Sequence, residues 1–175
     1  MKKNGLLLFF MIALTMFISC DKDDDKNENG SGSSTLPVYA ELNGIKYFRF
    51  PPTDIYGYDT ERFCMKLDDD YPEYEFDDVT DEGYIYSAIC KEKRNLFYFT
   101  NDNYEMYKVR IEISTSVIPA ADLAKILNNV GILSDGRTSD GQGLKYTVPG
   151  NKLVLIVTES SSTWNLDFCD KKYYK

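Results

Sequence analysis

The sequence predicts an α+β domain built mainly of antiparallel β-sheet, with about nine strands and one helix packed on them. Two observations predict this class. After position 36 the apolar residues fall in short runs rich in β-branched and aromatic side chains, separated by Gly, Pro, Asn and Asp. Only residues 120–130 space their apolar side chains as an amphipathic helix does. Both a sandwich and a partly closed barrel fit this pattern.

The first element expected is a β-hairpin over residues 38–50. Its centre, Asn43-Gly44, favours a two-residue turn in which both residues have positive φ. This turn fixes three cross-strand pairs, Leu42 with Ile45, Glu41 with Lys46, and Ala40 with Tyr47.

The next segments predict a loop over residues 53–60 and a strand over 62–67, where Phe63, Met65 and Leu67 alternate with polar residues. Residues 68–82 are dominated by Asp and Glu and contain Pro72. They predict a long exposed loop or a weak edge strand.

Three runs, 84–90, 96–100 and 106–115, predict a meander of antiparallel strands. The third alternates regularly, which predicts one buried and one solvated face. The apolar side is Tyr107, Val109, Ile111 and Ile113, and the polar side is Lys108, Arg110, Glu112 and Ser114.

The helix predicted over 120–130 is opened by Pro119 and ended by Gly131. A polar, Gly-rich stretch over 134–143 is expected to be irregular, and strands follow at 144–148, 153–158 and 163–169. Trp164 lies in phase with apolar neighbours in the last strand, which favours a core position.

Length and charge narrow the range of functions. Residues 36–175 suit a single globular domain. The net charge of −8 makes nucleic acid an unfavourable partner. The chain has no histidine, so histidine-based triads and histidine metal ligands are excluded.

The beginning of the chain has the parts of a secretory signal: Lys2 and Lys3, then an apolar run over 5–18, then the small residue Ser19 before Cys20. The apolar run is shorter than the roughly 20 residues that span a bilayer as a helix. The segment Phe17-Ile18-Ser19-Cys20 resembles the lipobox of bacterial lipoproteins. The resemblance implies that residues 1–19 are a signal peptide and that Cys20 carries the lipid anchor.

Residues 20–35 form an acidic, Gly/Ser-rich stretch that predicts a solvated tether. Its acidic run, directly after Cys20, is similar to the export signal of Bacteroides-type surface lipoproteins. That resemblance implies an outer-membrane location facing the cell exterior. The alternative is a flexible spacer that carries no address.

Three cysteines remain besides Cys20: Cys64, Cys90 and Cys169. Their number allows one disulfide and one thiol, and their spacing does not define a pairing. Buried, unreactive cysteines are the simpler interpretation.

The acidic region also offers oxygen ligands for calcium. The candidates are Asp68, Asp69, Asp70, Asp77, Asp78 and Asp81. No known ligand spacing is present, so a solvated acidic segment is the competing interpretation. No cofactor is expected, because phosphate-binding and dinucleotide-binding glycine motifs are absent.

Four tyrosines in expected loops, Tyr56, Tyr58, Tyr71 and Tyr74, are candidates for contacting a ligand. These observations together predict a lipid-anchored, surface-exposed binding or accessory protein, without catalysis, for an unknown protein or glycan. The alternatives are an envelope hydrolase that uses two carboxylates and a structural coat or adhesin-like protein.

Overall fold

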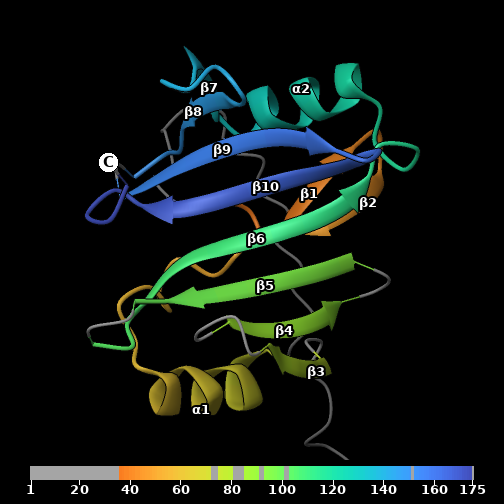
Figure 1. The fold of residues 1–175 in the computed structure, drawn as a ribbon. Helices are drawn as coiled ribbons and strands as arrows, with labels where there is room; N and C mark the ends of the chain where they lie inside the picture. Colours follow the sequence, from red (N-terminus) through yellow and green to blue (C-terminus); the bar gives the residue numbers. More distant parts are fainter. Residues whose placement is uncertain are drawn as a thin grey trace, which may run out of the picture. The chain divides into compact units, whose positions relative to one another are not determined.

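The computed structural model describes residues 36–71, 75–80, 85–90, 93–100, 103–150 and 152–174. All of them belong to one compact unit, Ser33–Lys175. They form ten strands and two helices (Figure 1). In chain order these are β1 (Tyr39–Leu42), β2 (Ile45–Arg49), α1 (Thr60–Asp70), β3 (Glu75–Thr80), β4 (Ile85–Cys90), β5 (Lys93–Phe99), β6 (Met106–Ser114), α2 (Ala120–Asn129), β7 (Leu133–Arg137), β8 (Leu144–Thr147), β9 (Leu153–Ser160) and β10 (Thr163–Asp170).

Eight of the strands form one antiparallel sheet in the order β3-β4-β5-β6-β10-β9-β8-β7, and β1 and β2 form a separate hairpin. The α+β class and the antiparallel sheet are therefore as predicted. The predicted number of strands and of helices is wrong. Within the described part of the chain the large sheet is open, with β3 and β7 at its edges, so it is not a closed barrel.

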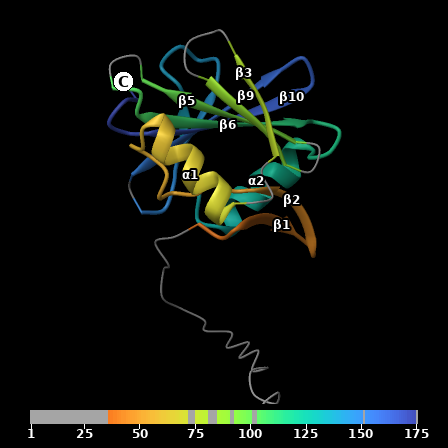
Figure 2. The ribbon, with the colours of Figure 1, turned by 90° about the horizontal axis from the view of Figure 1, so that it is seen from below.

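Both helices and the hairpin lie on the same face of the large sheet (Figure 2). On β6, Val109 belongs to the apolar cluster around α1, whereas Ile111 and Ile113 belong to the cluster around α2 and the hairpin. Residues two apart on a strand point to the same side. The two clusters are therefore neighbours on one helix-covered face.

The helix α1 replaces the strand predicted over 62–67. Asp59 caps it, because its Oδ1 accepts a hydrogen bond from the backbone N–H of Arg62 at 2.9 Å. Phe63 and Leu67, four residues apart, are buried against the sheet, while Met65 is 59% exposed. Alternation at three positions fits a strand, but Phe63 and Leu67 alone also fit one side of a helix.

The acidic segment, predicted as a long exposed loop or a weak edge strand, is divided between two elements, and the edge-strand alternative is confirmed for part of it. Asp68, Asp69 and Asp70 are the last residues of α1, and Glu75–Thr80 is the edge strand β3. The polar stretch after position 133 also contains an unpredicted edge strand, β7, all of whose residues are exposed. Hydrogen bonding to β8, rather than an apolar pattern, defines that strand.

The helix α2 follows the prediction within one residue. Leu123, Ile126 and Leu127 are buried, and the helix ends where Gly131 adopts φ 75°. Trp164 is half-buried, packs against the same cluster and donates from Nε1 to the carbonyl oxygen of Ile118 at 2.8 Å, so it points toward the core as predicted but is not fully buried.

The predicted hairpin is confirmed at its turn, with Asn43 and Gly44 both at positive φ. Leu42 pairs with Ile45 and Glu41 with Lys46 as expected. A register shift after Ala40 then pairs it with Phe48 and not with Tyr47. The shift brings two apolar side chains, 0% and 3% exposed, into the core together.

A second register shift changes the predicted alternation of β6. It falls between Tyr98 and Phe99 of β5, so that Phe99 pairs with Met106. Met106 is buried in the cluster around α1, and Tyr107 is only half-buried. The prediction that Tyr107 belongs to the apolar side of the strand is therefore wrong.

Candidate functional site

The face of the large sheet opposite the helices carries the polar side of β6, and we call it the open face. Lys108 and Arg110 are half-buried there, on either side of the buried Val109. The register places Lys108 between Tyr98 of β5 and Cys169 of β10. Two residues along the strands it places Arg110 opposite Asp167 of β10. Strands far apart in sequence thus bring these five side chains together.

The centre of the open face is an ion pair between Arg110 and Asp167. The guanidinium donates from Nε to Oδ1 at 2.6 Å and from Nη2 to Oδ2 at 2.8 Å. The two side chains are only 28% and 13% exposed. This bidentate hydrogen bonding raises the pKa of Arg110 and uses both oxygens of the carboxylate.

Lys108 has a different environment. Its Nζ lies 3.6 Å from the centroid of the Tyr98 ring. Within the described part of the chain, its ammonium has no hydrogen-bond acceptor and no ion pair, because the nearby Asp167 is bound to Arg110. Partial burial lowers the pKa of Lys108, mainly through loss of hydration.

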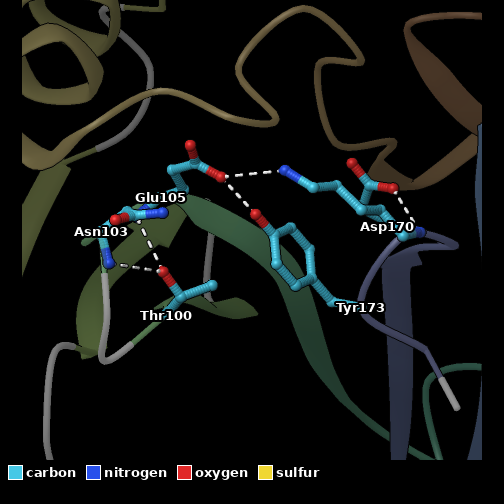
Figure 3. Close-up of polar contacts among 6 residues, drawn as sticks. Thr100, Asn103, Glu105, Asp170 and Tyr173 are labelled. Carbon is cyan, nitrogen blue, oxygen red and sulfur yellow. Dashed lines mark hydrogen bonds and ion pairs between the residues drawn. The ribbon is translucent and has the colours of Figure 1, made fainter.

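A set of contacts that we call the C-terminal clasp joins Glu105, just before β6, to Lys172 and Tyr173, just after β10 (Figure 3). The Glu105 carboxylate accepts hydrogen bonds from the hydroxyl of Tyr173 and from Nζ of Lys172, the latter at 3.4 Å. These two donors, Tyr173 first, lower the pKa of Glu105. The clasp extends to the open face because the rings of Tyr173 and Tyr107 pack edge to face at 5.8 Å.

The loop before β6 holds Glu105 in place. The hydroxyl of Thr100 accepts hydrogen bonds from the backbone N–H of Asn103 at 3.4 Å and of Glu105 at 3.2 Å (Figure 3). On the other side, the side chain of Asp170 accepts from the backbone N–H of Lys172 at 2.8 Å. The clasp therefore connects two locally ordered turns.

Beyond the clasp, Tyr174 packs on a small buried cluster of the open face, Val154, Ile156 and Cys169. Nζ of Lys145 lies 5.3 Å from the centroid of the Tyr174 ring. This part of the face is covered by the chain itself. The accessible polar part lies over β5, β6 and β10.

The tyrosines predicted as ligand contacts serve internal contacts where they are described. Tyr56 donates to the carbonyl oxygen of Phe168 at 3.0 Å, and the ring of Tyr58 lies 3.9 Å below the guanidinium of Arg62. Tyr71 donates to Oδ1 of Asp54 at 3.1 Å. All three also pack, partly buried, against the apolar cluster around α1. Tyr74 lies outside the described residues.

The calcium candidates are likewise not assembled where the structure can be followed. Asp70 is bound by Lys66, which also contacts Asp54 at 3.3 Å. The side chains of Asp77 and Asp78 are not described, and Asp81 lies outside the described residues. Among the described residues, no group of three acidic, cysteine or histidine side chains is placed to hold a metal ion.

Cys64 and Cys169 are both free thiols, so they do not pair with each other. Burial raises the pKa of Cys64, and it raises that of Cys169 to about 12. Cys169 is buried and Cys64 is half-buried, and a raised pKa disfavours the reactive thiolate at both. The side chain of Cys90 is not described.

The lipobox residues Phe17, Ile18 and Ser19 and the lipidation candidate Cys20 lie outside the described residues. None of the described helices has the length and apolar character needed to cross a bilayer.

The described fold and face define an open antiparallel sheet that is covered by helices on one side only. No protein-family model, curated protein or solved structure matches this chain. Its function therefore has to be inferred from the site, because a fold alone does not define an activity.

Sequence reasoning did not identify the open face as the site, although part of the signal is visible. The alternation over 106–115 places Lys108 and Arg110 on one side of a strand. What the sequence does not show is that β10 lies beside β6, which brings Asp167, 57 positions from Arg110, into contact with it.

Proposed function

We propose that this protein is a lipid-anchored binding protein of the cell surface that holds an extracellular partner on the open face and catalyses no reaction. Cys20 would carry the anchor, and residues 20–35 would form the tether between the membrane and the domain. The observation that carries the proposal is the placement of both helices and the hairpin on one side of the sheet (Figure 2). The other side is left with ordered, partly exposed polar side chains.

Contacts within the protein hold these side chains in fixed positions, which favours binding. Arg110 is held by two hydrogen bonds, and Tyr98 lies against Lys108. Side chains that are already fixed lose little conformational freedom when a partner docks.

The hydrogen bonds of two carboxylates near the open face, Asp167 and Glu105, favour a binding function over hydrolysis. Both oxygens of Asp167 accept from Arg110, and Glu105 accepts from Tyr173 and Lys172. A general acid or base needs to exchange a proton with the substrate, and these two groups are committed to structural contacts.

The anchor and the export signal are tested in cells with the full-length protein. Cys20→Ala is expected to release the protein from the membrane fraction, whereas Cys64→Ala, the control, leaves it there. Protease added to intact cells is expected to cut the domain. Replacing the Asp residues of the tether by Asn is expected to protect it. If only lysed cells lose the domain, the protein faces the periplasm and the proposal of surface display fails.

A further inference from the structure

We infer that the open face binds a carboxylated polysaccharide, with one sugar carboxylate held by Lys108. This inference rests on the proposed binding function and names the chemical class of the partner. It begins from the one cation near the centre of the face that lacks a counterion in the described part of the chain.

The environment of the Lys108 ammonium favours binding of an anion. It is half-buried, and the Tyr98 ring lies against it. Among the described residues, the charged or titratable groups that act on it come from its own strand and from β10 and β5: Arg110, Asp167, Cys169 and Tyr98. Of these, the only carboxylate has both oxygens bound to Arg110. A ligand carboxylate would supply the missing acceptor and restore part of the lost hydration energy.

The negative net charge of the chain favours an anionic ligand with few charges over one with many. The net charge is −8, and the ion pair beside Lys108 is neutral as a unit. A dense polyanion such as nucleic acid would be repelled by the protein as a whole. A polymer with one carboxylate per sugar or per few sugars can place one carboxylate on Lys108 and keep the others away from Glu112, which lies on the same face opposite Asn165.

Two neutral polar side chains of the open face suit the hydroxyl groups of a sugar. Asn165 of β10 lies directly opposite Thr158 of β9, and both side chains are half-buried. Neither side chain makes a hydrogen bond in the described part of the chain, so both can bond a ligand. Cys169 pairs with Lys108, and Asn165 lies four residues away from Cys169 on β10. The distance along the strand from Cys169 to Asn165 is therefore about 13 Å. A ligand that reaches both places is a polymer and not a small anion.

A polypeptide fits this face less well. The backbone N–H and C=O groups of β5, β6 and β10 are used in the ladders between strands. An extended peptide usually binds at a sheet edge, where main-chain groups are open to pair with it. On the flat face its own backbone groups would lose water without gaining partners. Sugar hydroxyls, by contrast, can use the side-chain groups that the face presents.

The experiment measures binding of the full-length protein in detergent to polygalacturonate, to its fully methyl-esterified form, and to polyglutamate. The variants are Lys108→Gln, Lys108→Arg, which keeps the charge, and Lys125→Gln. Lys125 lies on α2, on the other side of the sheet, and is 63% exposed, so its variant is a matched control for charge. Melting curves verify that each variant is folded.

We expect the wild-type protein and Lys125→Gln to bind polygalacturonate equally, and neither to bind the esterified polymer. Lys108→Gln should weaken binding at least about tenfold, the loss expected for one charge-assisted hydrogen bond, and Lys108→Arg should retain most of it.

Three results would overturn the inference: no binding of polygalacturonate by the folded protein, equal binding of the esterified polymer, or equal binding by Lys108→Gln and the wild type. Lys108-dependent binding of polyglutamate alone would also overturn it and would identify a polypeptide as the partner. In each case the protease and Cys20 tests decide the proposed surface anchoring separately.

Discussion

The segment 62–67 offers a direct test of the fold, because its two possible structures predict opposite roles for Met65. As a strand, it would bury Phe63, Met65 and Leu67 on the same side. As the helix α1, it buries Phe63 and Leu67 and leaves Met65 59% exposed. The variants Phe63→Ala and Met65→Gln distinguish the two.

The burial of each side chain sets the expected change in unfolding free energy. Phe63 is 0% exposed and its ring packs against Phe97 at 4.9 Å and Phe99 at 5.2 Å. Removing such a ring is expected to cost about 3–5 kcal/mol of unfolding free energy. Met65→Gln changes an exposed position in a helix and should stay within about 0.5 kcal/mol.

The assay is urea unfolding of the two variants and the wild type, followed by tryptophan fluorescence of Trp164, the only tryptophan. Phe63→Ala should shift the midpoint strongly and Met65→Gln should not. If Met65→Gln destabilised the protein as much as Phe63→Ala, Met65 would be buried, and the helix with its core contacts would be refuted.

Three further predictions concern the open face, the clasp and the thiols. Asp167→Asn removes the charged partner of the half-buried Arg110 and should cost about 2 kcal/mol in urea unfolding; an unchanged midpoint would show that the pair contributes nothing. The pKa of Glu105 is lowered by its donors, so its contribution to stability is present above the ordinary value of 4.5 and is lost as pH falls through the lower folded value. The difference in melting temperature between wild type and Glu105→Gln should therefore shrink as pH falls below 4.5, and a difference constant from pH 7 to pH 3 would contradict this. Cys169, with a pKa of about 12, should react with a thiol reagent at pH 8 only after unfolding, and more slowly than Cys64. Peptide mass spectrometry measures the labelling of each cysteine. Equal labelling of both in the native protein would refute the burial of Cys169.

Local signals predicted the elements that depend on few residues. The Asn43-Gly44 turn and the helix α2 followed from residue types that favour those conformations. Register was less predictable, because the shifts at Ala40 and Phe99 depend on which apolar side chain fills the core better.

Elements that depend on a partner were missed. In 62–67 an alternating and a helical spacing coincide, and the N-cap Asp59 was the signal that would have decided between them. The edge strand β7 is too polar to be recognised without β8 beside it, and β3 could be predicted only as one of two alternatives because its pairing with β4 is not visible in the sequence. The site was missed for the same reason, since Lys108 and Asp167 become neighbours only when β10 pairs with β6.

The most direct test of the central claim is lysine labelling on intact cells with a membrane-impermeant amine reagent, compared with the purified protein by mass spectrometry. The account predicts that Lys125, on α2, is labelled equally in both, and that Lys108 is labelled less on cells because a surface polymer occupies the open face. Equal labelling of Lys108 in both would contradict an occupied open face. No labelling of Lys125 on cells would contradict surface display.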